Sequence, residues 1–335
     1  MRVRLGYVSI SKKLGKKVTS SSTVTFSNYN KIVLPEKKLE KLKSVSASNL
    51  KDLETIIKYN IENNIHFYRI TSALIPLVTH PEVGYWGHRE FLKKDFEYVG
   101  KLINNSKMRV DTHPDEFNVI NSVNPQVVEN TKINLLRQAE WFEDFKYDLG
   151  KMVIHVGGAT NGKEAGIERF INNFNTFPNE IKSRIIIEND DKTYTASETL
   201  FLCKELNVPM VLDIHHHNCN NTDDNIYNLI PEIFETWKNE QLSPKLHFSS
   251  PKDGEKDRKH ADFINPVDFI YFIENIKKFN TDIDIMLECK EKDIALFKLA
   301  RCPWLGEAAP QPECCSVCAQ KAPARPGLPW SCPPA

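Results

Sequence analysis

The sequence predicts an α/β fold, a TIM (β/α)8 barrel in a single domain. Short runs rich in Val, Ile and Leu alternate along the chain with longer segments of amphipathic, helical pattern. Eight such strand–helix units fit within roughly the first 300 residues of the 335-residue chain, and this number and size are typical of the barrel. An open, doubly wound sheet is the alternative that the same alternation allows.

The predicted strands are short and almost continuously apolar, which is typical of parallel strands that are buried on both faces. In chain order they are Val3–Val8, Ile65–Ile70, Met108–Asp111, Met152–Val156, Arg184–Ile187, Pro209–Leu212, Lys245–Phe248 and Ile283–Leu287.

Amphipathic segments between these strands predict the helices. Residues 49–57 carry apolar side chains at helical spacing, and Ser48 or Asn49 is suited to cap that helix. The stretch 11–45 is polar, so we expect it to form a long loop that leads into the first helix. Similar patterns predict helices at residues 130–141, 195–206 and 266–276.

Charge and hydropathy narrow the class of protein. Lys and Arg together number 44, as do Asp and Glu, which excludes a uniformly basic nucleic-acid binder but allows a local basic rim. The first residues run directly into a strand without the apolar core of a secretory signal. No apolar stretch approaches the ~20 residues of a membrane span. We therefore expect a soluble, cytoplasmic protein.

The composition changes near residue 301, and we predict a barrel domain at 1–300 and a separate tail at 301–335. The tail holds five of the eight cysteines and eight of the 19 prolines, so we expect it to be disordered or artefactual. Cys315 and Cys318 form a C-x-x-C pair, but no second pair of ligands follows at zinc-finger spacing.

Side chains that can bind metals stand at or just after the ends of six consecutive predicted strands. A single His or Glu at a strand end is ordinarily just a polar residue, but six in succession indicate a shared site. In a TIM barrel these strand ends meet at one mouth, where active sites assemble. In chain order the residues are His113, His155, Glu188, Asp213 with His216, Lys245 with His247, and Glu288.

The mixture of His, Glu and Asp without Cys indicates the kind of ion. Nitrogen and oxygen ligands suit Mn²⁺ or Zn²⁺, and several carboxylates favour more than one ion. Two ions ~4 Å apart stabilise the attacking and leaving oxygens of phosphodiester cleavage. Sugar isomerases use similar ions in a similar barrel, so the residues alone leave both activities open.

Several segments together resemble the ultraviolet damage endonuclease family, in order, from residue 1 to about 300. They are Arg4-Leu5-Gly6-Tyr7, residues 112–117 (Thr-His-Pro-Asp-Glu-Phe), Asn121-Ser122, residues 153–158, residues 187–190, residues 213–216, residues 245–249, His260-Ala261-Asp262 and Leu287-Glu288.

The resemblance implies a TIM barrel related to endonuclease IV-type enzymes. It implies incision of double-stranded DNA immediately 5′ of cyclobutane dimers and 6-4 photoproducts, and at abasic sites, without ATP. It also implies a cluster of up to three divalent ions, typically manganese. We expect a monomer with DNA as its partner. An abasic-site endonuclease and a metal-dependent sugar isomerase of the same barrel type are the alternatives.

The resemblance also assigns roles. Glu188 and Glu288 would bridge two ions, and Lys245 corresponds to a lysine that can carry a carboxyl group and so become a ligand. We take these three residues as catalytic. The remaining implied ligands are His113 and His155 for one ion, Asp213 and His247 for another, and His216 and His260 for the third.

Lesion recognition is implied at four positions. Glu116 and Phe117 stand where the family has a wedge of Gln and an aromatic residue, so the aromatic is retained and the amide is lost. Tyr7 matches an aromatic near the lesion, and Ser11 stands where Asn is common. Candidate phosphate contacts are Arg89, Lys163 and the basic run 252–259.

Overall fold

The computed structural model describes residues 1–222 and 225–302. Its eight strands are all parallel and form a closed barrel in the order β1 to β8, which confirms the predicted fold class. The strands are β1 (Val3–Val8), β2 (Phe67–Ile70), β3 (Arg109–Thr112), β4 (Lys151–His155), β5 (Ile185–Glu188), β6 (Met210–Asp213), β7 (Lys245–Phe248) and β8 (Ile283–Leu287).

The barrel closes where the first strand meets the last. Val3 pairs with Ile283 and Tyr7 with Leu287, so β1 and β8 lie in register along five residue pairs. The central strands are buried along their whole length, as their apolar composition predicts. Every strand therefore points its carboxyl end toward the same mouth.

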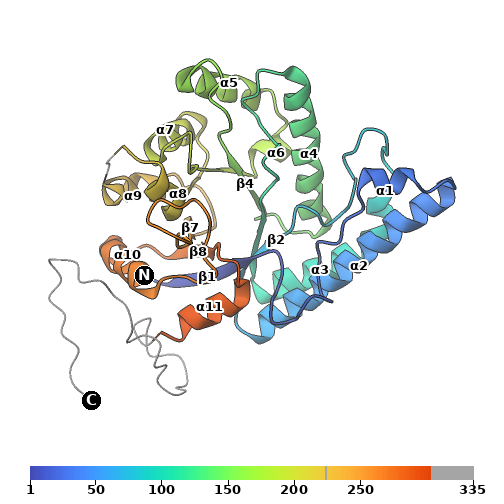
Figure 1. Ribbon diagram of the computed structural model, residues 1–335, viewed down its shortest axis with the longest axis horizontal. Helices are drawn as coiled ribbons and strands as arrows, with labels where there is room; N and C mark the ends of the chain where they lie inside the picture. Colours follow the sequence, from blue (N-terminus) through green and yellow to red (C-terminus); the bar gives the residue numbers. More distant parts are fainter. Residues whose placement is uncertain (223–224, 303–335) are drawn as a thin grey trace.

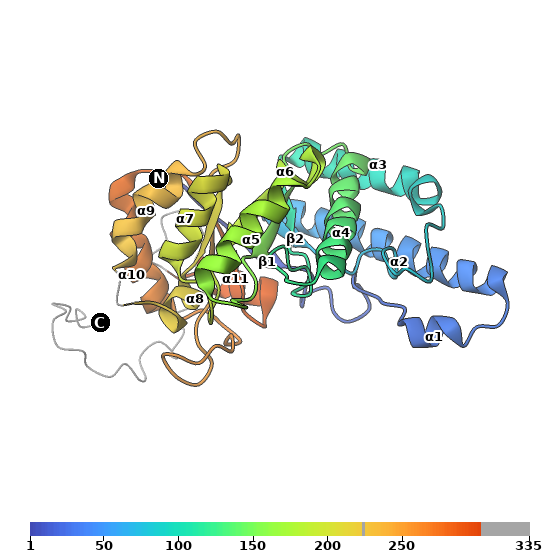
Figure 2. The ribbon, with the colours of Figure 1, turned by 90° about the horizontal axis from the view of Figure 1, so that it is seen from above.

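The helices surround this barrel (Figure 1). They are α1 (Phe26–Asn30), α2 (Pro35–Glu62), α3 (His88–Ser106), α4 (Pro125–Asp144), α5 (Lys163–Asn175), α6 (Asn179–Lys182), α7 (Ala196–Leu206), α8 (Ile214–Cys219), α9 (Ile226–Glu235), α10 (Pro266–Ile276) and α11 (Lys292–Ala300), with a 3-10 turn at Lys277–Phe279. Figure 2 shows α1 and the adjoining end of α2 reaching away from the barrel.

The first long helix begins earlier than we predicted. α2 runs for 28 residues from Pro35, so much of the expected loop is helix. Pro35 occupies the first turn, where its missing N–H costs nothing. Asn49 is not a cap, because it lies inside α2 with its buried side chain bonded to the backbone of Ser22 and Leu74.

Other helix signals are confirmed. Thr195 caps α7 in a reciprocal pair with Glu198, and Pro266 begins α10. The last helix, α11, begins at Lys292, and the predicted tail from residue 303 onward lies outside the described residues. Within the described part of the chain, no helix is both long and apolar enough to span a membrane.

Candidate metal centre

The mouth of the barrel gathers seven of the nine expected ligands. Each stands at or just beyond the carboxyl end of a strand, so the parallel barrel brings together residues that are far apart in sequence. They are His113 after β3, His155 in β4, Glu188 in β5, Asp213 in β6, His216 in α8, His247 in β7 and Glu288 after β8.

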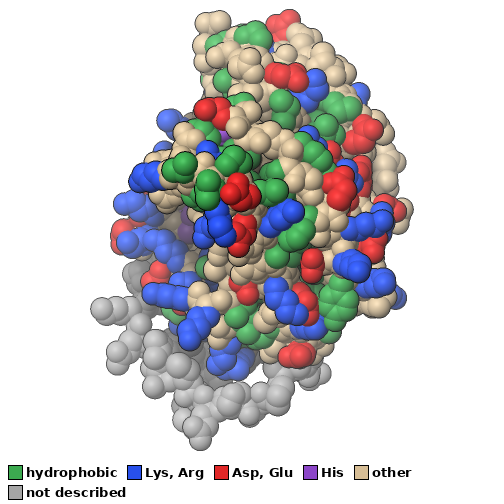
Figure 3. All heavy atoms as spheres, turned by 90° about the vertical axis from the view of Figure 1, so that its right-hand side faces the viewer, with side chains coloured by type: hydrophobic (Ala, Val, Ile, Leu, Met, Phe, Trp, Pro, Cys, Tyr) green, Lys and Arg blue, Asp and Glu red, His purple; other side chains and the backbone are tan. Residues whose placement is uncertain are grey.

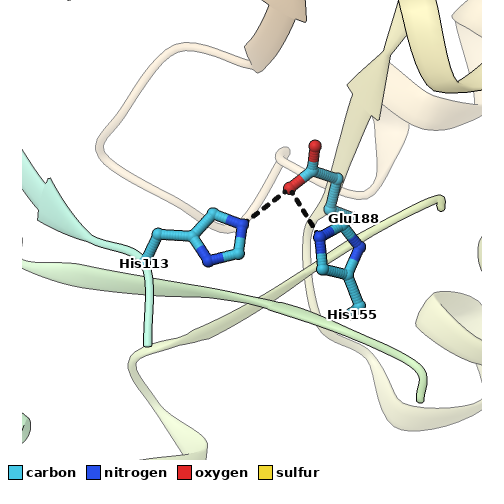
Figure 4. A group of neighbouring side chains, drawn as sticks. All are labelled: His113, His155 and Glu188. Atoms are coloured by element: carbon cyan, nitrogen blue, oxygen red, sulfur yellow. Dashed lines mark hydrogen bonds and ion pairs between the residues drawn. The ribbon is translucent and has the colours of Figure 1, made fainter. Parts of the chain in front are cut away.

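Glu188 occupies the centre of this cluster and is fully buried. Its Oε2 atom lies 3.1 Å from His113 Nε2 and 3.7 Å from His155 Nε2 (Figure 4). Its Oε1 atom lies 2.7 Å from His247 Nδ1 and 3.4 Å from His216 Nδ1. Each oxygen therefore faces two imidazoles, and one carboxylate is shared between two halves of the site.

Three groups of side chains are compact enough to hold a metal ion, and all three contain Glu188. Their ligand atoms lie within 4.8 Å of one another in each group. The groups are His113–His155–Glu188, Glu188–Asp213–His216 and Glu188–His247–Glu288. This arrangement supports a bridging position for Glu188.

Two expected ligands lie outside these groups. The ring of His260 is centred 6.3 Å from that of His216, and its Nδ1 atom lies 2.8 Å from Ser249 Oγ. Lys245 is fully buried, and its ammonium lies 2.5 Å from Asp111 Oδ2. Lys245 is therefore paired with a carboxylate in this structure.

The remaining side chains fit a divalent cation. The Asp213 Oδ2 atom is buried without a hydrogen-bond partner in the described chain. It lies 3.9 Å from both His216 Nδ1 and His247 Nδ1. A buried acceptor that faces imidazoles at this distance, with no thiolate present, is typical of a nitrogen–oxygen metal site.

The charges of the cluster are strongly coupled. Burial raises the pKa of Asp213 to about 7. Burial acts to lower the pKa of His216, but Asp213 and Glu188 raise it to about 11. Burial lowers the pKa of His247 to about 4, although Glu188 and Glu288 oppose that change. A cation at the centre would relieve the repulsion between carboxylates and favour neutral imidazoles.

Arg69, which the sequence analysis did not single out, supports one side of this cluster. It lies in β2 with only 5% of its surface exposed. Its Nη1 atom donates to Glu288 Oε1 at 2.6 Å, and its Nη2 atom lies 2.7 Å from His247 Nε2. Burial opposes ionisation of Glu288, but Arg69 and His247 hold its pKa below the usual range. The sequence signal that could have identified Arg69 is an Arg inside an otherwise apolar strand.

Two expected lesion contacts are buried side chains in this structure. Tyr7 is fully buried, and its hydroxyl donates to Asn60 Oδ1 at 2.7 Å. Ser11 is 2% exposed and donates to Asp293. Tyr7 is thus bonded to α2 and Ser11 to α11, which pack against the first strand and its loop.

Glu116 and Phe117, in contrast, are exposed on the loop after β3. Phe117 is 64% exposed, although it is a large apolar residue. This loop also carries His113. The exposed aromatic and a candidate ligand therefore lie four residues apart in the same loop.

The candidate phosphate contacts divide into two kinds. Arg89 is bound to Asp144, and Lys163 is bound to Glu198, so both cations are already paired. The run 252–259 is largely exposed, although its Arg258 is bound to Asp191. Figure 3 shows Lys and Arg side chains gathered beside a hollow in which His is visible.

A family model described as UV-endonuclease UvdE matches residues 3–311 of the chain. The chain belongs to this family. The match continues past residue 300, where we placed the end of the barrel domain. Membership identifies the chain as a nuclease and decides against the sugar isomerase that the ligand types alone left open.

Individual relatives agree with the family. The chain is 36% identical over 303 residues to the UV DNA damage endonuclease of Halalkalibacterium halodurans, covering 90% of this chain and 94% of that one. It is 38% identical over 301 residues to the UV DNA damage endonuclease of Bacillus cereus strain B4264, covering 89% and 94%.

The fold of this chain is similar to those of solved structures. The crystal structure of SacUVDE is 32% identical, with a TM-score of 0.79 over 89% of this chain and 96% of that one. Endonuclease IV from Thermus thermophilus is 13% identical, with a TM-score of 0.53 over 76% and 94%. The second likeness shows a shared barrel only.

Proposed function

We propose that this UvdE-family chain hydrolyses double-stranded DNA immediately 5′ of UV photoproducts, both cyclobutane dimers and 6-4 photoproducts. We propose that it also cleaves at abasic sites and needs no ATP. The observation that carries the proposal is the buried Glu188 carboxylate, which four imidazoles share at the mouth of the barrel. The named relatives supply the class of substrate.

Divalent ions, with Mn²⁺ our proposal, are the cofactors that this cluster would hold, up to three of them. When bound, such ions stabilise the charge that develops on the phosphate and on the leaving oxygen. Glu188 is placed to join the ligand groups, and Arg69 keeps Glu288 ionised and oriented. His260 and Lys245 remain proposed ligands, with Lys245 requiring a carboxyl group for that role.

Phe117 and Glu116 are the proposed contacts to the lesion. A UV dimer stacks and pairs poorly, so extruding it from the helix costs less than extruding normal bases. An exposed aromatic on the loop that carries His113 can stack on the bases that remain. Glu116 carries a carboxylate, which accepts hydrogen bonds but donates none when ionised.

A nicking assay tests this function. Three duplexes would be compared, with one cyclobutane dimer, one abasic site or no damage, each with Mn²⁺ and with a chelator. We expect Mn²⁺-dependent cleavage on the 5′ side of the dimer and no cleavage of undamaged DNA. Cleavage of the abasic duplex alone would replace the proposal with an abasic-site endonuclease.

Two variants test whether the cluster is needed, one inside it and one matched control outside it. Glu188→Gln keeps the size of the side chain but removes its charge, and we expect it to abolish nicking. Glu129→Gln removes an equally charged group from an exposed ion pair on α4, and nicking should be unchanged. Equal activity of the two variants would contradict a role for the cluster.

A further inference from the structure

Lys292 has an unusual backbone conformation beside the metal centre. It is the first residue of α11 and has φ of 48°, in the left-handed region that lysine seldom adopts. Lys107 and Lys146 share this conformation, but they follow helices, where a left-handed residue is a common way to end. Lys292 begins a helix, so helix termination does not account for it.

Hydrogen bonds on both sides hold this turn in place. The next residue, Asp293, is fully buried and accepts from Ser11 Oγ at 2.5 Å, Lys12 N at 2.7 Å and Tyr59 Oη at 3.0 Å. On the other side, Glu291 N donates to Asp262 O at 3.1 Å. The turn is therefore fixed to the loop after β1 and to the loop that carries His260. Unfavourable backbone that is held so firmly is often found at functional sites.

The side chain of Lys292 is partly buried between charged groups of the mouth. Burial lowers the pKa of its ammonium, while Glu288 acts to raise it and Arg69 to lower it. Within residues 1–222 and 225–302, this ammonium forms no hydrogen bond or ion pair. Glu288 is already bound by Arg69 at 2.6 Å, so it does not need Lys292 as its partner.

We propose that Lys292 binds an oxygen of the DNA phosphate that enters the metal centre. An ammonium without a partner at the rim of a phosphodiester-cleaving site has a natural ligand in a phosphate oxygen. The fixed turn carries this cation four residues beyond Glu288, and Asp293 anchors it. This inference rests on the proposed function, because it assumes that DNA is the substrate.

Lys292→Gly is the first test, since glycine adopts the left-handed turn without strain. We expect unchanged or higher thermal stability and unchanged Mn²⁺ content by mass spectrometry. We expect kcat/KM for nicking of the dimer duplex to fall roughly 10- to 100-fold. DNA binding, measured by anisotropy in chelator, should lose about one unit of slope in its dependence on salt concentration.

Two further variants separate charge from structure. Lys292→Arg keeps a cation and should keep nicking within about fivefold of the parent. Lys290→Gln removes an exposed lysine two residues away and should change nicking less than about twofold.

Each result of these measurements either supports or overturns the proposed phosphate contact of Lys292. Parental kcat/KM and salt slope in Lys292→Gly would overturn the proposal while the endonuclease function stood. Loss of Mn²⁺ from that variant would also overturn it, because Lys292 would then serve the metal ligands. If the parent itself fails to nick, the proposed function fails, and the salt slope of DNA binding still decides whether Lys292 contacts phosphate.

Discussion

Two clusters of buried charge lie inside this barrel, one at the mouth and one near the start of the strands. In the deeper cluster every carboxylate directly contacts a cation. Asp284 accepts from Arg4 Nε at 2.5 Å and from Arg109 Nη1 at 2.7 Å, and Asp111 accepts from Lys245. Arg109 also packs against the rings of Phe67 and Trp237, each centred 5.1 Å away.

The cluster at the mouth has a different composition. Its carboxylates face imidazoles, with Arg69 as the cation in direct contact with Glu288. Buried charge alone therefore does not identify a functional site in this barrel. A carboxylate paired only with Arg or Lys indicates a structural role, whereas carboxylates surrounded by histidines indicate a place for a cation.

The largest expected effect comes from Glu188→Gln at the mouth. It removes the charge that all three ligand groups share, so we expect nicking to fall at least about a thousandfold. Bound Mn²⁺ should fall as well, measured by mass spectrometry on the dialysed protein. The chain should stay folded by circular dichroism, because the buried amide replaces a buried charge. Retained Mn²⁺ with retained nicking would place the metal centre elsewhere.

Asp284→Asn should lower the stability of the chain but leave Mn²⁺ content and kcat unchanged. It leaves Arg4 and Arg109 without their shared carboxylate, which we expect to cost roughly 3–5 kcal/mol of unfolding free energy. Urea denaturation measures this loss. Below the unfolding transition, Mn²⁺ content and kcat should match the parent. A selective loss of Mn²⁺ at constant stability would show that the two clusters are not independent.

Lys245 pairs with Asp111 of the deeper cluster but is also a proposed metal ligand, so its substitution tests which cluster it serves. As an ammonium it neutralises Asp111, so Lys245→Met should cost roughly 3 kcal/mol by removing the hydrogen-bonded cation of that buried carboxylate, which keeps only the more distant Arg69 at 3.8 Å. The double variant with Asp111→Leu should recover most of this loss. Intact-protein mass spectrometry tests the other possibility, since a carboxylated lysine adds the mass of CO2. Such an adduct, together with loss of Mn²⁺ in Lys245→Met, would assign Lys245 to the mouth.

Phe117→Ala should produce a smaller change confined to DNA. The variant keeps every candidate ligand, so Mn²⁺ content should be unchanged. Loss of a stacking surface worth roughly 1–3 kcal/mol should lower kcat/KM on the dimer duplex about tenfold. Ile133→Ala, another exposed apolar residue, is the matched control and should have little effect. Equal losses in both variants would argue against a wedge at Phe117.

The smallest expected effect is a dependence of metal affinity on pH. Burial raises the pKa of Asp213 to about 7, so this carboxyl is mostly protonated at pH 6 and mostly ionised at pH 8. Because Mn²⁺ must displace the proton, its affinity should rise about tenfold across this interval. Titration calorimetry in buffers of different ionisation enthalpy would detect the released proton.

The raised pKa of Asp213 also determines how the stability of the metal-free protein depends on pH. The pKa of Asp213 in the folded chain lies above its ordinary value of 3.8, so its contribution to metal-free stability is complete below that value. The contribution is lost as the pH rises through 7. Flat Mn²⁺ affinity between pH 6 and 8 would show that Mn²⁺ displaces no proton with a pKa near 7, and so would contradict the raised pKa of Asp213 as the cause.

The strands could be predicted from sequence because buried parallel strands are continuously apolar. Metal-capable residues at the strand ends then followed from the geometry of the barrel. Arg69 was missed because its function depends on reaching Glu288 and His247 from within a strand. The burial of Tyr7 and Ser11 could not be predicted, because packing by helices distant in the sequence sets their exposure. The start of α2 was missed because its first half is polar.

The most direct test of the distinction between the two clusters is a crystal structure of Mn²⁺-loaded protein with anomalous scattering from manganese. We expect at least two anomalous peaks at the mouth, in contact with Glu188, and none near Asp284 or Asp111. Absence of peaks at Glu188 in crystals that retain Mn²⁺, or a peak in the deeper cluster, would contradict it.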